Sequence, residues 1–203
     1  MTYQTKNYRI QGGSTWVIKG ELEFQESGKI NDVGKWEDLR FPAAGLKAPG
    51  VNPPNYDTFK GGINICWFDK ATDESLHLQA QLPHSWKPGT ALLPHIHWTS
   101  TASSTTIVRW GLEYVIGDVA TAFSTAKFLY VNDNPKGIKY HELALLGTIP
   151  LTTHIGPSLM LSARLFRHAS NAADTYNADA GLLEFDLHYK VGSLGTTSPG
   201  HAT

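Results

Sequence analysis

"GLLEFDLHYKV", residues 181–191, alternates between apolar and polar side chains. Its apolar positions are Leu183, Phe185, Leu187 and Tyr189, and its intervening polar positions are Glu184, Asp186 and His188. Alternation with a period of two indicates a β-strand that buries one face. The stretch therefore predicts a strand whose other face carries two carboxylates and an imidazole.

Seven further segments show similar strand patterns between residues rich in Gly, Pro, Asn and Asp. They are residues 62–69, 75–82, 93–100, 105–117, 126–132, 140–151 and 158–167. In 105–117 the core face consists of Val108, Trp110, Leu112 and Tyr114. About eight strands in a single run predict an all-β fold, a jelly-roll-like antiparallel sandwich. Within 140–151, "ELALLG" is also compatible with a helical turn.

Composition narrows the class of protein. The chain has 203 residues, of which 41% are hydrophobic, enough for one large domain or a domain with an appendage. Its 17 Lys and Arg nearly balance its 18 Asp and Glu, which argues against nucleic acid as the partner. We also find no apolar run long enough to span a membrane and no secretory signal. The single cysteine, Cys66, cannot form an internal disulfide and is expected in the core.

The N-terminal part has a different character. "TWVIKGELEFQESGKI" (15–30) alternates like one or two short β-rungs, which cannot bury an apolar face without neighbours. We therefore predict an extended N-terminal β-arm, residues 1–34, for docking or oligomerisation. A Pro/Gly-rich connecting segment, 35–60, is pinned to a surface; the sandwich spans 61–195, and 196–203 form a flexible tail. The expected interface residues are Trp16, Ile18, Leu22, Phe24, Trp36, Leu39 and Phe41.

His95 and His97, in "LPHIHWTS" (93–100), share one face of a predicted strand, about 6.6 Å apart. One interpretation is a cupin-like metal site, because Gly89 precedes His95 by the cupin spacing. The glutamate that cupins place shortly after the second histidine is missing here. A metal enzyme needs about three protein ligands, and the sequence supplies two in this stretch.

Two other interpretations remain for this pair. Chains related by a threefold axis would bring six imidazoles to one transition metal, so His95 and His97 would suffice. Alternatively, both histidines belong to a hydrogen-bonded polar layer formed with the acids of 181–191 and with Arg109 and Glu113 of 105–117. Arg109, Arg164 and Arg167 are available to pair with buried acids in such a layer.

Other signatures of catalysis are weak. The sequence has no Gly-x-Ser-x-Gly and no Gly-rich phosphate loop, so we assign no catalytic residue. Trp86, in "PHSWKPGT", is the best candidate for an exposed aromatic residue that contacts a glycan. A carbohydrate-binding receptor-recognition module is therefore a further alternative.

Several phrases together resemble a family of small phage and prophage virion proteins. They are "WEDLRFPAAGLKAPGVNPPNYDTFKGG", "LQAQLPHSWKPGTALLPHIHW", "VRWGLEY", "RLFRHA" and "LLEFDLHY". The resemblance covers roughly residues 35–191. It implies a non-enzymatic structural protein of the bacteriophage head, neck or tail, a capsid decoration, fibre or spike component. Such a protein would be a homo-oligomer, and the expected form is a homotrimer built on a jelly roll. It would assemble in the host cytoplasm with other virion proteins. No catalytic residues are transferred from the family, and we assign no cofactor apart from the possible transition metal at His95 and His97.

Overall fold

A computed structural model describes residues 7–9, 16–18, 35–103, 106–154, 156 and 158–192. Contacts between residues divide the chain into two units, Met1–Asn31 and Asp32–Thr203. In the first unit, β1 (Asn7–Arg9) pairs with β2 (Trp16–Ile18) in an antiparallel two-stranded sheet. All other described strands belong to the second unit.

The second unit confirms each of the eight predicted strands. They are β5 (Ile63–Phe68), β6 (Glu74–Gln81), β7 (Leu93–Ser100), β8 (Val108–Gly117), β9 (Lys127–Asp133), β10 (Glu142–Leu145), β11 (Met160–Arg167) and β12 (Ala180–Lys190). The "ELALLG" segment forms the strand β10 and not a helical turn. Within the described part of the chain, no helix is long and apolar enough to cross a bilayer.

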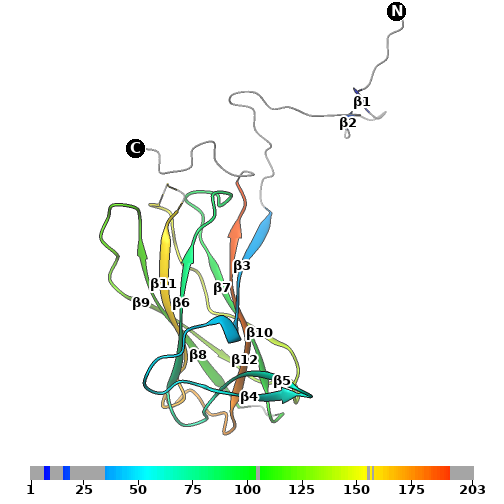
Figure 1. Ribbon diagram of the computed structural model, residues 1–203, viewed down its shortest axis with the longest axis vertical. Helices are drawn as coiled ribbons and strands as arrows, with labels where there is room; N and C mark the ends of the chain where they lie inside the picture. The colour runs from blue at the N-terminus through cyan, green and yellow to red at the C-terminus, as the bar shows by residue number, and fades with distance from the viewer. Residues whose placement is uncertain are drawn as a thin grey trace, which may run out of the picture. The chain divides into compact units, whose positions relative to one another are not determined.

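Among these eight strands, the first pairs with the last, the second with the one before the last, and so on inward. The antiparallel pairs β5–β12, β6–β11, β7–β10 and β8–β9 make up one long hairpin. The additional pairs β7–β12 and β8–β11 wrap that hairpin into two sheets, ordered β10-β7-β12-β5 and β6-β11-β8-β9. Figure 1 shows the sheets as two layers of a sandwich. This connectivity is that of a jelly roll, so the predicted fold class is confirmed.

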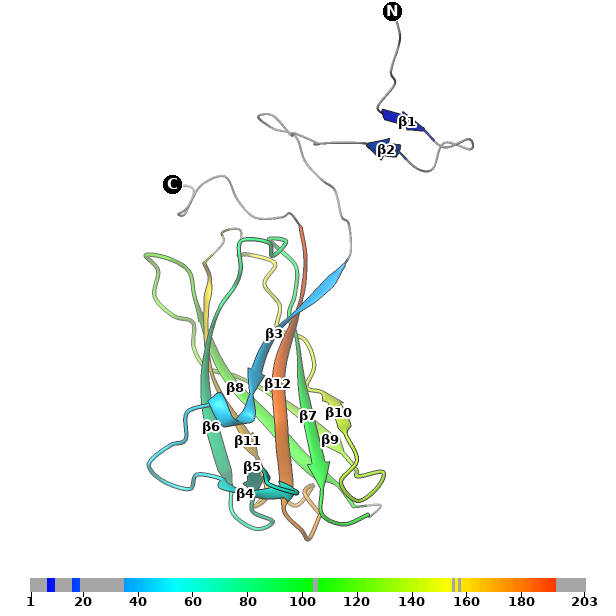
Figure 2. The same cartoon turned by 45° about the vertical axis from the view of Figure 1, so that its right-hand side comes forward.

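Two further strands come from the segment predicted to be a connection. β3 (Trp36–Pro42) pairs with β12, and β4 (Asn55–Lys60) pairs with β5, with the short 3₁₀ helix η1 (Ala43–Gly45) between them (Figure 2). Residues 35–60 are thus part of the sandwich. Both strands are mostly exposed, so they lack the apolar alternation that identifies a half-buried strand.

The core lies between the two sheets. Val108, Trp110, Leu112 and Tyr114 of β8 are buried there, as predicted. β12 departs from its predicted alternation, because the pairing with β7 shifts by one residue between Leu182 and Glu184. Leu182 consequently enters the core, and Leu183 lines a hollow with the polar residues of β12. Its predicted core position is wrong because a β-bulge changes which side chains share a face.

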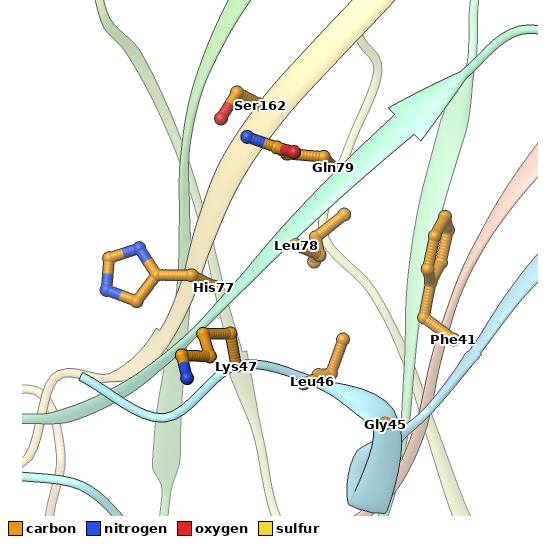
Figure 3. A pocket seen from close by; sticks show the side chains of 8 residues that line it. All are labelled: Phe41, Gly45, Leu46, Lys47, His77, Leu78, Gln79 and Ser162. Carbon is orange, nitrogen blue, oxygen red and sulfur yellow. The ribbon is translucent and has the colours of Figure 1, made fainter.

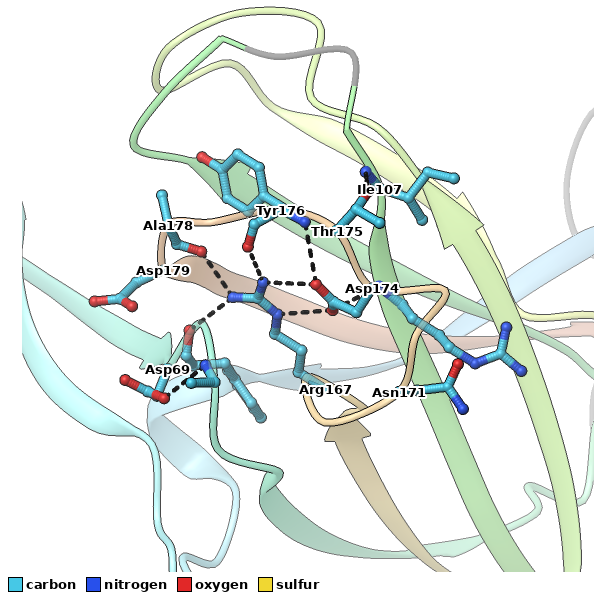
Figure 4. Close-up of polar contacts among 12 residues, drawn as sticks. Asp69, Ile107, Arg167, Asn171, Asp174, Thr175, Tyr176, Ala178 and Asp179 are labelled. Atoms are coloured by element: carbon cyan, nitrogen blue, oxygen red, sulfur yellow. Dashed lines mark hydrogen bonds and ion pairs between the residues drawn. The ribbon is translucent and has the colours of Figure 1, made fainter.

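Arg167, at the end of β11, is fully buried and makes a hydrogen bond with each of its five N–H groups. Nε and Nη2 each donate to the Asp174 carboxylate at 2.9 Å. The remaining N–H groups donate to three backbone carbonyls, those of Phe68, Ala178 and Tyr176 (Figure 4). A buried guanidinium is tolerated when it is paired and saturated in this way. Arg167 therefore holds the loop from residue 168 to 179 against the sandwich.

Candidate histidine–aspartate site

The polar residues of β12 meet those of three other segments on the outer face of one sheet. In the pairing of β12 with β7, His97 lies opposite Glu184 and His95 lies opposite Asp186. In the pairing of β12 with β3, Arg40 lies opposite Asp186 and Asp38 lies opposite His188. Neighbours directly opposite each other in antiparallel strands point to the same face. The intervening residues of β7 and β12 fill the core, so this set faces outward.

Asp186 is the centre of this face. It is only 3% exposed, although it lies on the outer side of the sheet. Its Oδ1 accepts from Nδ1 of His95 at 3.2 Å, and its Oδ2 accepts from Nε2 of His97 at 2.7 Å. His188 approaches from the same strand, with Nε2 3.5 Å from Oδ1. One buried carboxylate therefore contacts three imidazoles.

The histidines also contact one another. The rings of His95 and His188 lie edge to face, with centroids 3.9 Å apart. Burial, followed by the charge of a protonated His188, lowers the pKa of His95, while Asp186 opposes that shift. The environment of His95 therefore favours its neutral ring.

A second layer of contacts surrounds the cluster. Nδ1 of His97 lies 2.7 Å from Nε2 of His141, so one ring donates and the other accepts. Nε2 of His188 also lies 2.9 Å from Oδ1 of Asp38. Arg40 forms a bidentate pair with Glu184, at 2.5 and 2.8 Å, and this hydrogen bonding lowers the pKa of Glu184. Above these side chains is a hollow of about 470 Å³.

The structure combines His95 with partners that the sequence did not assign to it. Ligand atoms of His95, Asp186 and His188 lie within 4.8 Å of one another. His97 instead contacts the second oxygen of Asp186 and His141. The shared face of Glu184, Asp186 and His188 is visible in the sequence. The pairing of β12 with β7, which brings His95 to that face, is not.

The polar-layer interpretation did not name the arginine that pairs with the acids of β12. Glu184 pairs with Arg40. Of the expected partners, Arg164 pairs with Glu113, Arg109 donates to Asn132, and Arg167 is bound to Asp174. Arg109 and Arg164 belong to the opposite sheet, so they cannot reach the outer face of β12.

Trp86 is not an exposed aromatic residue. It is 2% exposed and part of the core, so the prediction that it lies open to a glycan is wrong. The segment around it carries Pro and Gly as a loop does, but residue 86 pairs with Val191 and turns its indole inward. Burial removes the residue on which the carbohydrate interpretation depended.

The predicted interface residues have several environments. Trp36 is 44% exposed and lies under the ammonium group of Lys190. Leu39 and Phe41 are partly buried and pack against the sandwich core. Trp16 and Ile18 form the ends of β2, whereas Leu22 and Phe24 lie outside the described residues.

A second hollow, of about 400 Å³, lies between β6 and the segment that follows β3 (Figure 3). Phe41, Leu46 and Leu78 contribute apolar surface to it. Lys47 and His77 lie beside one another in Figure 3, and their backbones exchange hydrogen bonds of 2.9 and 2.8 Å. The segment is thereby tied to the edge strand β6. This hollow lacks the convergence of acidic and imidazole groups found on the other sheet.

Comparison with known proteins finds likeness in structure only. No protein-family model matches the chain, and no curated protein matches it. The Cry4Aa toxin from Bacillus thuringiensis aligns with a TM-score of 0.48 and 13% identity, covering 76% of this chain and 24% of the toxin. The infectious bursal disease virus Gx strain structure aligns at 0.40 and 8%, covering 88% and 37%. A Family 16 carbohydrate-binding module aligns at 0.37 and 15%, covering 70% and 92%. The chain thus spans well under half of the toxin and viral chains.

Proposed function

We propose that this chain is a non-enzymatic structural protein of a phage virion, assembled as a homo-oligomer, with the trimer as the expected form. The supporting observation is the separate N-terminal unit, in which β1 and β2 form a sheet of two strands. A two-stranded hairpin is at best marginally stable in water. Association with other copies would give it the cover that it needs. The oligomer would attach to the head, neck or tail.

The edge of the sandwich offers a second surface for association. Exposed apolar residues gather on β10 and in the turn before it, namely Ile138, Tyr140, Leu143 and Leu145. Each is at least 47% exposed, and β10 is the edge strand of its sheet. Contiguous exposed apolar groups on a sheet edge are typical of surfaces that bind another chain. The sequence phrases that resemble phage virion proteins support the same proposal.

Truncation tests the role of the N-terminal unit. The complete chain and a chain that begins at Asp32 are compared by light scattering at micromolar concentration, with circular dichroism to verify folding. A chain lacking residues 193–203 serves as the control, because it loses a terminal segment but keeps the N-terminal unit. We expect the complete chain and the control to be oligomers, and we expect the chain from Asp32 to contain fewer copies per particle. A complete chain that is monomeric would overturn the proposed assembly.

A test of the virion assignment requires purified phage particles. Mass spectrometry of phage particles purified from a host that carries this sequence should detect the chain in stoichiometric amount. Chemical cross-linking of the same particles should join it to itself and to a capsid, neck or tail protein. Particles that form normally without the chain among their proteins would refute the assignment.

A further inference from the structure

Three donor groups on the outer face of the sheet have the spacing of metal ligands. Oδ1 of Asp186 lies 3.2 Å from Nδ1 of His95 and 3.5 Å from Nε2 of His188. Two ligands that are each about 2.0–2.1 Å from a tetrahedral zinc ion lie about 3.4 Å apart. The two distances bracket that value. The ligand atoms of all three residues lie within 4.8 Å of one another, so they are close enough to converge on one ion.

The charge of Asp186 gives an independent reason for a cation at this position. Its carboxylate is nearly inaccessible to water, and an isolated buried carboxylate is costly. The side chains that contact it are three imidazoles, whose ring nitrogens are common metal ligands. A divalent ion would compensate the carboxylate and would use the imidazole nitrogens as ligands.

The surrounding residues fix the orientation of Asp186. Nε2 of His97 donates to Oδ2 at 2.7 Å, and Nδ1 of His97 forms a hydrogen bond with the ring of His141. The carboxylate therefore keeps Oδ1 directed toward His95 and His188. Partners of this kind, which contact a ligand and not the ion, typically set the orientation of metal ligands. His97 contacts the other oxygen of Asp186 and is not one of the three grouped ligands, so it is a positioning residue in this arrangement.

We propose that His95, Asp186 and His188 bind one divalent transition-metal ion per chain. Two imidazoles with one carboxylate suit zinc, iron and related ions more than calcium or magnesium, which prefer oxygen ligands. Asp38 lies on the open side, with Oδ1 2.9 Å from Nε2 of His188. Its carboxylate or a water molecule in the hollow would complete the coordination. The ion would connect β7 to β12.

This site differs from one shared across a threefold axis. A shared site would use His95 and His97 of three chains and would bind about one-third of an ion per chain. The proposed site needs no second chain, so its stoichiometry is one per chain in any oligomeric state. Metal binding and the proposed virion role consequently fail or succeed separately.

Titration with zinc tests the proposal. The full chain is freed of metal with a chelator, and ZnCl₂ is added in a calorimeter; Co²⁺ absorption then reports the ligand geometry. We expect one ion per chain. His188→Gln should weaken binding by more than about 100-fold, because removal of a group that only supports a ligand already costs about 10–100-fold. His97→Gln should keep the stoichiometry and weaken binding within that lower range.

His154→Gln is the matched control. His154 is also a partly buried histidine paired with a carboxylate, with Nδ1 2.7 Å from Oδ2 of Asp118. It should bind zinc as the unchanged protein does. Asp186→Asn, checked for folding by circular dichroism, should lose binding as His188→Gln does. The proposal is overturned if the unchanged protein binds no zinc at millimolar concentration. Binding unaffected by His188→Gln, or one-third of an ion per chain dependent on His97, would overturn it as well.

Discussion

Asp174→Asn should be one of the most destabilising single substitutions in the chain. The change keeps the size of the side chain but removes the negative charge beside Arg167, whose side chain is 0% exposed. It also turns an amide N–H₂ toward a guanidinium N–H, so one of the two hydrogen bonds becomes a contact between donors. The backbone N–H groups of Arg109 and Tyr176, which donate to Asp174, lose a charged acceptor too.

The magnitude follows from these contacts. Each hydrogen bond to a charged group contributes about 1.5–3 kcal/mol, so the two bonds between Arg167 and Asp174 amount to roughly 3–6 kcal/mol. Breaking one partner of a buried pair costs about 3–5 kcal/mol by a separate route. Both routes include a loss of about 3–5 kcal/mol in the free energy of unfolding. For a chain of this size each kcal/mol lowers the melting temperature by about 2–4 °C, so the expected decrease is roughly 6–20 °C.

Urea unfolding and thermal melts followed by circular dichroism measure the effect. Glu113→Gln is the control, because it removes the same charge from the Arg164–Glu113 pair, whose side chains are about one-third exposed. Exposed pairs contribute about 0–1 kcal/mol, so this variant should melt near the unchanged protein. A loss below about 1 kcal/mol for Asp174→Asn would refute the reasoning, since the buried guanidinium would then need no counter-charge.

Three other predictions concern the core, the sheet packing and the pH dependence. Burial raises the pKa of the Cys66 thiol, so it should resist a thiol reagent in the native protein and react in urea. Gly111→Ala should cost about 1–3 kcal/mol in urea unfolding, because an added Cβ would lie 2.3 Å from the Phe166 ring. The hydrogen bond with Arg40 lowers the pKa of Glu184, so its contribution is present above the ordinary glutamate pKa of about 4.3 and disappears as pH falls through the lower folded value. Glu184→Gln should therefore flatten the acid side of the stability curve.

Each of these predictions has either a control variant or a result that would contradict it. Gly62→Ala places its Cβ in open space, so it should be nearly neutral in the same assay. Rapid labelling of the native thiol would contradict the buried position of Cys66. An unchanged acid slope in Glu184→Gln would show that the ion pair with Arg40 does not form in solution.

The sequence alone determined the strands whose pattern is local. Alternation with a period of two depends on neighbouring residues and a single buried face, so β8 could be predicted together with its inward side chains, such as Trp110. β3 and β4 escaped prediction because sheet edges expose most of their residues and select no apolar pattern. The sequence also placed Leu183 in the core where the structure buries Leu182, because a bulge is a property of the pairing between two strands.

The candidate site depends on tertiary structure. The sequence places His95 and His97 on one face and Asp186 with His188 on another, but these pairs are about 90 residues apart. Whether they meet depends on which strands are neighbours and in what register. That choice is made by the burial of both inner faces against the opposite sheet, a sum over the whole core that no single segment encodes. Only the pairing of β7 with β12 turned two separate polar faces into one carboxylate contacted by three imidazoles.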